Sequence, residues 1–423
     1  MSLSYWGNTE NIKEFLIYNN FTMKRFDIKP ADRISKVEEY YFSVKLKEIA
    51  AMRAEGRDII NLGIGSPDLP PHDNVIEALC RESHKSNAHG YQPYIGIPEL
   101  RGAFAEWYKR WYGVELNPNS EVLPLMGSKE GIMHISMAFL NKGDGVLVPN
   151  PGYPTYTGAS KLVGANIINY SLVEDNGWWP DFDSLEKCHR MGIINLDAVK
   201  LMWCNYPNMP TGAPASRELF ERIVAFGRKW NIIICHDNPY SFILNDNPLS
   251  ILSVDGAKEC CIELNSLSKA SNMPGWRIGM LASNSKFVEW ILRVKSNMDS
   301  GMFRPIQIAA AEALMLPRSW YEQMNEVYAG RRAVARAILE AVGCRVDDRQ
   351  TGLFLWGKIV GGSSESSCEP ISKQLCDKLL YKCGVFLAPG AIFGSNGNNY
   401  MRISLCCDNE MLGEALKRVR NRT

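Results

Sequence analysis

A lysine and an arginine eight residues apart are the first residues in this sequence that suggest chemistry. They are Lys269 and Arg277, within the segment SLSKASNMPGWRIG that spans residues 266–279. A Met-Pro-Gly step separates them, so one regular helix cannot hold both side chains. Alone, such a lysine would be a surface residue on a loop. Together, the two residues predict a bent segment that directs one amine and one guanidinium towards a single ligand.

Polar residues also follow two other apolar runs. Asp237 and Tyr240 come after WNIIIC, and Gly127, Ser128 and Lys129 open a helix after EVLPL. Alone, the aspartate would be a helix N-cap and the Gly-Ser turn an ordinary helix start. In open α/β sheets, however, ligands bind at the carboxyl ends of strands, and a helix N-terminus favours an anion. With the lysine, these groups match pyridoxal 5′-phosphate, which needs an amine, an acid for its ring nitrogen, a donor for its phenolate oxygen and a phosphate cradle.

The elements that must position these residues alternate along the middle of the chain. Apolar runs of about five residues end in polar or glycine residues, and a helical segment follows each of them, which predicts an α/β fold with a buried, mostly parallel central sheet flanked by helices. Helical spacing is also expected over residues 36–54 and from about Pro98. A mixed pattern after residue 300 predicts a smaller α+β domain. We expect an N-terminal arm or extension at 1–22, a large cofactor-binding domain at 74–305, and a small domain made of 23–73 and 306–423.

The composition narrows the class of protein. The chain has 423 residues and a formal net charge of +1, which argues against a nucleic-acid or membrane partner. Its 12 cysteines form no CxxC pairs. The N-terminus lacks a secretory apolar stretch, and no run is long enough to span a bilayer. We therefore expect a reduced, cytoplasmic protein.

Three motifs together resemble the class I/II aminotransferases of the aspartate aminotransferase superfamily, which have PLP fold type I. The motifs are SLSK…GWRIG, DNPY and RISL, and the resemblance extends from INLGIGSPD to YMRISL. It implies that Lys269 forms the covalent imine with the cofactor aldehyde and then moves a proton as a base. Asp237 would pair with the pyridine nitrogen, and Tyr240 would donate to the cofactor's O3′.

The resemblance also implies the remaining contacts of the cofactor and the substrate. Tyr153 would stack on the cofactor ring, although a core aromatic residue is an alternative. Tyr91 would reach the phosphate of a neighbouring subunit's cofactor, which implies a homodimer with shared active sites. Arg402 would hold the substrate α-carboxylate in a two-pronged contact, with the Gly65 backbone beside it. The phosphate cradle would comprise Gly127, Ser128, Lys129, Ser266 and Arg277.

One position departs from the family pattern. The family usually reads Asn-Pro-Thr-Gly where this chain reads NYPNMPTG, so Met209 stands directly before Pro210. That asparagine normally supports the hydrogen bond to O3′. We expect Asn208, one place earlier, to take over the contact, or the contact to be lost.

The implied activity is the transfer of an amino group between an L-amino acid and a 2-oxo acid. The donor is open among aspartate, diaminopimelate and alanine types, and aromatic donors are also compatible. Arg304 is a candidate partner for a distal carboxylate, with a structural or solvent-facing arginine as its alternative. A carbon–sulfur lyase of the same fold would use the same cofactor residues. A non-catalytic PLP-binding regulator is disfavoured, because the N-terminal stretch has no room for a DNA-binding module. No residue is assigned to a metal.

Overall fold

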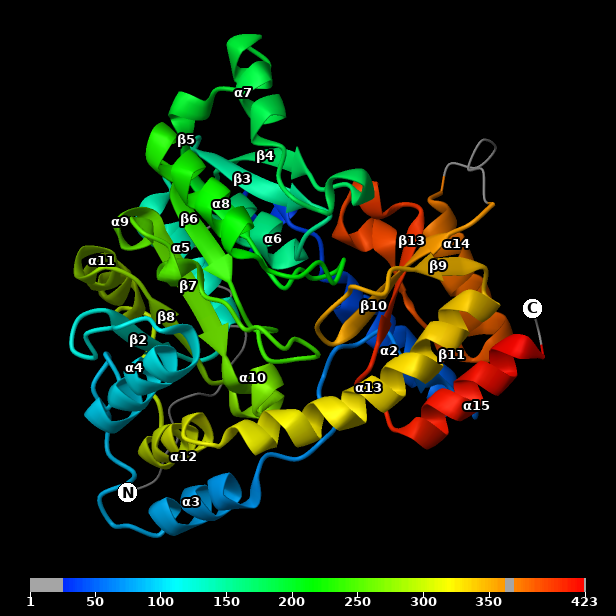
Figure 1. The fold of residues 1–423 in the computed structure, drawn as a ribbon, viewed down its shortest axis with the longest axis horizontal. Coiled ribbons are helices and arrows are strands. Elements are labelled where there is room, and N and C mark those ends of the chain that lie inside the picture. Colours follow the sequence, from blue (N-terminus) through cyan, green and yellow to red (C-terminus); the bar gives the residue numbers. More distant parts are fainter. Residues whose placement is uncertain (1–25, 362–368, 422–423) are drawn as a thin grey trace, which may run out of the picture.

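The computed structural model describes residues 26–361 and 369–421, and Figure 1 shows its fold. The expected N-terminal arm, 1–22, lies outside these residues. Two groups of sheets organise the described chain: a large sheet built from the middle of the sequence, and smaller sheets built mainly from its C-terminal part. Among the described helices, none combines the length and the apolar composition that a bilayer crossing requires.

The large sheet has seven strands in the order β2-β8-β7-β6-β5-β3-β4. The pairs within β7-β6-β5-β3-β4 are parallel, whereas β8 runs antiparallel to both β7 and β2. Every residue of β2, β7 and β8 is buried, which agrees with the continuous apolar runs. The mostly parallel α/β sheet is therefore confirmed. The strands are β2 (Val122–Leu125), β3 (Gly145–Asn150), β4 (Asn166–Ser171), β5 (Val199–Cys204), β6 (Ile233–Asp237), β7 (Cys261–Ser266) and β8 (Gly279–Ala282).

Helices surround this sheet, as Figure 1 shows. Their apolar faces close the core on both sides of the strands, and helix α4 begins at Pro98 as expected. The helices of this part are α3 (Asp73–Ser83), α4 (Pro98–Tyr112), α5 (Ser128–Phe139), α6 (Pro154–Leu162), α7 (Phe182–Arg190), α8 (Arg217–Trp230), α9 (Ala257–Cys260), α10 (Leu267–Ala270), α11 (Ser285–Lys295) and α12 (Arg304–Leu314).

The smaller sheets belong to the other end of the molecule. An antiparallel sheet has the order β12-β13-β10-β9, and β1 pairs in parallel with β11. This pairing joins a segment near residue 60 to the C-terminal part of the chain. The strands are β1 (Ile60–Asn61), β9 (Cys344–Val346), β10 (Phe354–Ile359), β11 (Val385–Phe386), β12 (Ala388–Pro389) and β13 (Tyr400–Ser404), and the helices are α2 (Tyr41–Ala54), α13 (Arg318–Ala341), α14 (Ile371–Lys378) and α15 (Asn409–Arg420).

Two boundaries expected from the sequence do not coincide with the ends of helices in the structure. The helix expected from residue 36 begins at Tyr41, because Tyr40 has an extended backbone and its side chain lines a cavity. The boundary at 306 falls inside α12, which packs against α3 and α4 beside the large sheet. The division into two domains itself stays a prediction.

Candidate active site

A cavity of about 610 Å³ lies at the carboxyl ends of the large-sheet strands, where they approach β10 and β13. It collects most of the residues singled out from the sequence. Residues from segments far apart in the chain meet here, including the start of α2, the start of α5, the end of β6, helix α10 and strand β13. This position agrees with the general rule for ligand sites in open α/β sheets.

Lys269 lies on the single turn of α10 that follows β7. Ser266 caps this turn by accepting a hydrogen bond from the Ser268 N–H at 3.1 Å. The Lys269 Nζ donates to the carbonyl oxygen of Gly65 at 2.5 Å. Burial lowers the pKa of the Lys269 amine, and the positive charges of Arg402 and Arg277 act in the same direction. A lowered pKa favours the neutral amine, which is the form that attacks a carbonyl or accepts a proton.

Arg277 reaches the same cavity after the chain bends. Residues Pro274–Trp276 form a short 3₁₀ turn, and Arg277 itself has a left-handed backbone with φ of 58°. Its Nη1 donates to the carbonyl oxygen of Pro274 at 2.9 Å. The bend predicted from the Met-Pro-Gly step is therefore present, and it brings an amine and a guanidinium to one cavity.

Asp237 ends strand β6 with a buried carboxylate. The Tyr156 hydroxyl donates to Asp237 Oδ2 at 2.9 Å, and the Tyr156 ring stacks on Trp203 with centroids 5.0 Å apart. The other oxygen, Oδ1, is buried and has no hydrogen-bond partner among the described residues. Burial raises the pKa of Asp237 to about 6, against the Tyr156 hydrogen bond and nearby positive charges. A buried carboxylate with one oxygen unpaired is suited to a cationic N–H donor, such as a protonated pyridine nitrogen.

The start of α5 forms a cradle for an anion. Gly127 precedes the helix with φ of 83°, and a Cβ at this position would collide with the Arg277 guanidinium. Ser128, Lys129 and Ser266 line the cavity beside it. Burial lowers the pKa of the Lys129 amine, and the Arg277 charge adds to this effect. The unpaired N–H groups of a helix start, two cations and serine hydroxyls fit a phosphate group.

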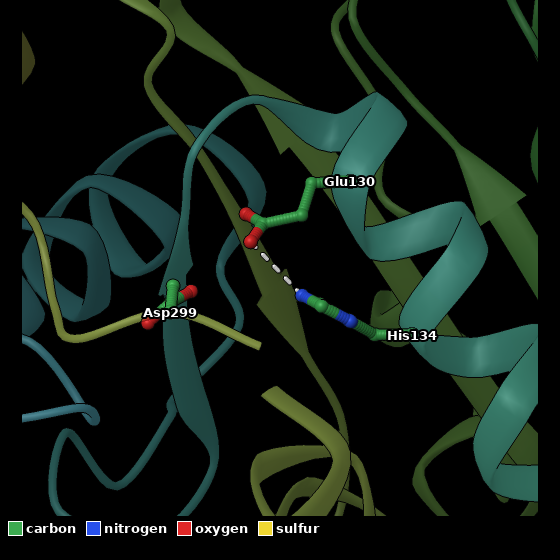
Figure 2. A group of neighbouring side chains, drawn as sticks. All are labelled: Glu130, His134 and Asp299. Atoms are coloured by element: carbon green, nitrogen blue, oxygen red, sulfur yellow. Dashed lines mark hydrogen bonds and ion pairs between the residues drawn. The ribbon is translucent and has the colours of Figure 1, made fainter. Parts of the chain in front are cut away.

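A cluster of ionisable side chains holds the start of α5 from behind. Glu130 accepts hydrogen bonds from the backbone N–H of Met126 at 2.6 Å and contacts His134 Nε2 at 2.9 Å. Asp299 lies near both residues, as Figure 2 shows, and it forms an ion pair with Lys295. The oxygens and a ring nitrogen of this cluster could hold a metal, but the carboxylate oxygens already contact Lys295, His134 and backbone N–H groups, and only His134 Nδ1 has no partner among the described residues. We therefore interpret it as a brace for the cradle.

Arg402 lies on β13 with its guanidinium buried among aromatic rings. The guanidinium carbon is 3.9 Å from the ring centre of Phe354 and 4.7 Å from that of Phe393. Arg402 Nη2 donates to the carbonyl oxygen of Gly63 at 2.6 Å, whereas among the described residues Nη1 contacts only the thioether sulfur of Met209, at 3.2 Å. Burial lowers the pKa of Arg402 to about 10, so the group is still charged near neutral pH. A charged guanidinium with a weak acceptor and an unpaired Nε is suited to a carboxylate.

Three further residues singled out from the sequence, Tyr240, Tyr153 and Gly65, line the cavity. Tyr240 lines the cavity, and burial raises its pKa well above the ordinary value, so its hydroxyl keeps its proton and can donate. Tyr153 also lines the cavity, with its ring edge-to-face against Tyr156. Gly65 is at the wall, where a Cβ would collide with the Phe354 ring.

The structure does not bring Asn208 into the cavity, which corresponds to the second of the two expected alternatives, loss of its contact. Its Oδ1 accepts hydrogen bonds from Thr211, and its Nδ2 donates to the carbonyl oxygen of Asn205 at 3.0 Å, so both ends of the amide close the loop on itself. Asn205 and Met209 line the cavity instead. Asn205 Nδ2 donates to the carbonyl oxygen of Asp237 at 2.5 Å, which ties this loop to β6.

Two other predicted residues lie outside the cavity of this chain. The Tyr91 side chain is 93% exposed, which leaves its expected role across a dimer as a prediction. Arg304 forms an ion pair with Glu99 at 2.8 Å, so its alternative as a structural arginine fits better.

Sequence reasoning missed several residues of the cavity wall. Tyr40 and Phe42 come from the start of α2, and Phe354 and Phe393 come from the C-terminal part. For these four the sequence carries no local signal. Tyr156 could have been found, because it lies on α6 only three residues after Tyr153, the N-cap of that helix.

Comparisons with known proteins show the family to which the chain belongs. The family model for aminotransferase class I and II matches residues 57–419. The LL-diaminopimelate aminotransferase of Nitratidesulfovibrio vulgaris is 41% identical over 400 residues, covering 93% of this chain and 99% of the relative. That of Halothermothrix orenii is 40% identical, covering 92% and 98%. The substrate-bound BacF structure from Bacillus subtilis has a TM-score of 0.86 at 35% identity, covering 93% of this chain and 98% of BacF. The chain is therefore a pyridoxal phosphate-dependent aminotransferase and belongs to the class I and II aminotransferase family.

Proposed function

We propose that the amino donor of this enzyme is LL-diaminopimelate. The observation that carries the proposal is the similarity over nearly the full length of both chains to several relatives named LL-diaminopimelate aminotransferase, at 38–41% identity. The cavity is compatible with a donor that has two charged ends, since its lining includes the charged Arg402 and a second cation, Lys47, midway along α2.

We assign a role to each of the main cavity residues from its position and its hydrogen bonds. Arg402 binds the donor's α-carboxylate through Nη1 and Nε. Lys269, whose pKa is lowered, binds the cofactor aldehyde and carries the proton that leaves the substrate Cα. The cofactor, when bound, supplies an electron sink for the bond that breaks at Cα. Asp237, whose Oδ1 has no partner among the described residues, would hold the proton on the ring nitrogen, and Tyr240 would donate to the phenolate oxygen.

The phosphate end of the cofactor is assigned to the start of α5. Gly127, Ser128 and Lys129 supply the helix N-terminus, and Ser266 and Arg277 close the other side. Tyr153 packs beside the ring. Because Asn208 is engaged within its own loop, we assign it no contact with the cofactor.

We further propose a homodimer in which Tyr91 reaches the partner's cradle. Exposed apolar side chains lie in the segments around Tyr91 and Phe303, and the rings of His89 and Phe303 are 5.8 Å apart. Large exposed apolar side chains that gather in one region indicate a protein interface. The cysteines of the described residues are all free thiols, which supports the proposed cytoplasmic location.

A donor and acceptor matrix tests the function. Purified enzyme loaded with the cofactor is mixed with LL-diaminopimelate, aspartate, alanine or phenylalanine, each with pyruvate or 2-oxoglutarate as acceptor. We expect the highest kcat/KM with LL-diaminopimelate and no turnover without an acceptor. Release of ammonia and a 2-oxo acid without an acceptor would instead indicate a lyase, and preference for another donor would contradict the proposed substrate.

A further inference from the structure

One charged side chain of the cavity has no role in the scheme above. Charged residues line the cavity at six described positions. Five of them are assigned to the cofactor or to the substrate α-carboxylate, and Lys47 remains. The six are Lys47, Lys129, Asp237, Lys269, Arg277 and Arg402.

Lys47 belongs to a preformed pair of opposite charges. Its Nζ lies 2.6 Å from Glu39 Oε1, and the Ser43 hydroxyl donates to the same oxygen at 2.7 Å. The two charged side chains are 70% and 52% exposed. Lys47 lines the cavity, whereas Glu39 lines the adjoining hollow, which shares Tyr40 and Phe42 with the cavity. An ion pair so exposed contributes little to folding, and its partners are free to exchange for a ligand's charges.

Helix α2 connects this pair to the site of the α-carboxylate. The Phe42 ring centre is 5.4 Å from the Arg402 guanidinium, and Lys47 follows five residues later, about 7.5 Å further along the helix axis. Phe42, Leu46 and Ile64 line the wall of the cavity. A substrate held by Arg402 at one end therefore meets an apolar wall that suits methylene groups, and then a cation and an anion together.

We propose that Lys47 and Glu39 bind the distal carboxylate and ammonium groups of the amino donor. This inference rests on the proposed function, because LL-diaminopimelate carries a second ammonium-carboxylate end. The distal carboxylate replaces Glu39 at Lys47, and the distal ammonium replaces Lys47 at Glu39. Total charge at the opening is unchanged by this exchange.

The pair also discriminates against related donors. A donor with only a distal carboxylate is attracted by Lys47 but repelled by Glu39. A donor with only a distal ammonium is attracted by Glu39 but repelled by Lys47. Specificity of this kind comes from repulsive as well as attractive contacts. Other cations fit the role less well, since Arg304 pairs with Glu99 outside the cavity and Lys129 faces the phosphate cradle.

A non-reacting ligand tests the contact by binding alone. Pimelate has two carboxylates on a seven-carbon chain and no amine, so it binds without reaction. Calorimetric titration of the cofactor-loaded enzyme should show a dissociation constant about fivefold higher for Lys47→Gln and several-fold lower for Glu39→Gln, in keeping with one exposed charge contact each. Equal dissociation constants for wild type and both variants would overturn the proposal.

Kinetics with three matched donors test the pairing. L-Lysine is LL-diaminopimelate without the distal carboxylate, and L-2-aminopimelate is the same molecule without the distal amine. Lys47→Gln should lower kcat/KM for LL-diaminopimelate and raise it for L-lysine, whereas Glu39→Gln should lower it for LL-diaminopimelate and raise it for L-2-aminopimelate.

A control separates this effect from general loss of surface charge. Lys229 forms an ion pair with Glu186 at the same 2.6 Å but does not line the cavity, so Lys229→Gln should leave all three values unchanged. If wild type turns over LL-diaminopimelate and the Lys47→Gln and Glu39→Gln variants keep its preference, the inference fails and the proposed function stands. If wild type does not turn over LL-diaminopimelate, the proposed function fails and the inference fails with it.

Discussion

Replacing Asp237 with asparagine should make the cofactor-free enzyme more stable while removing its activity. The carboxylate is buried, one of its oxygens has no partner among the described residues, and its pKa is raised from 3.8 to about 6. A difference of about two pKa units corresponds to ~3 kcal/mol of unfavourable free energy for the charged form in the folded state. Asparagine removes the charge and keeps an oxygen that accepts from the Tyr156 hydroxyl. At pH 8, the free energy of unfolding of Asp237→Asn should therefore exceed that of wild type by up to ~3 kcal/mol.

The pH dependence of this difference identifies its cause. The folded state binds a proton at Asp237 more tightly than the unfolded state does, so wild type gains stability from this group as the pH falls through about 6. The gain is complete below the unfolded pKa near 3.8. The advantage of the variant should therefore be largest above pH 7 and should shrink towards pH 4. Urea unfolding of both cofactor-free proteins across this range measures it. Equal stability at pH 8, or an advantage that grows in acid, would refute the assigned electrostatics.

Three further substitutions test the other assigned groups. Lys269→Ala should lower kcat by about 10²–10⁴-fold, the usual loss for a proton-transfer group, and borohydride should no longer attach the cofactor to the peptide that contains position 269; attachment at wild-type yield would contradict the role. Arg402→Gln should lower kcat/KM about 10–100-fold for every amino acid donor, as expected for the loss of one charged hydrogen-bonding contact. A loss confined to one donor would show that Arg402 binds the donor's side chain and not its α-carboxylate. Tyr156→Phe removes a hydrogen bond that lowers the pKa of Asp237. The acid limb of the pH profile of kcat/KM should therefore move to higher pH by about one unit. An unchanged acid limb would show that the Tyr156 hydroxyl does not control the pKa of Asp237.

The sequence predicts the part of the site that is built from strand ends. Lys269, Asp237 and the Gly127–Lys129 turn each follow a buried apolar run, and parallel strands bring their carboxyl ends to one edge. Arg277 also follows from local pattern, because a Pro-Gly break after a lysine forces a turn. These predictions needed only short-range signals and one rule of topology.

The remaining wall depends on contacts that a local pattern does not encode. Tyr40 and Phe42 are more than 200 residues before Lys269 in the chain, and they reach the cavity because α2 packs beside the small sheets. The absence of Asn208 from the cavity has a different cause. The Asn208 amide can form hydrogen bonds either with a ligand or within its own loop. In the structure its Oδ1 accepts from the Thr211 backbone N–H and hydroxyl, so the amide is not available to a ligand.

The surroundings of Arg402 link substrate recognition to the fold. Phe354 and Phe393 come from separate segments and pack on the guanidinium from within 5 Å, while the thioether of Met209 is a weak acceptor for Nη1. A buried cation with so few acceptors carries an uncompensated desolvation cost, which its lowered pKa reflects. A carboxylate supplies the missing acceptors and offsets this cost when it binds. The same aromatic wall that makes Arg402 unfavourable alone therefore makes a carboxylate ligand favourable. The apolar lining continues from Phe42 to Leu46 along α2, where Lys47 adds a second cation to the cavity wall.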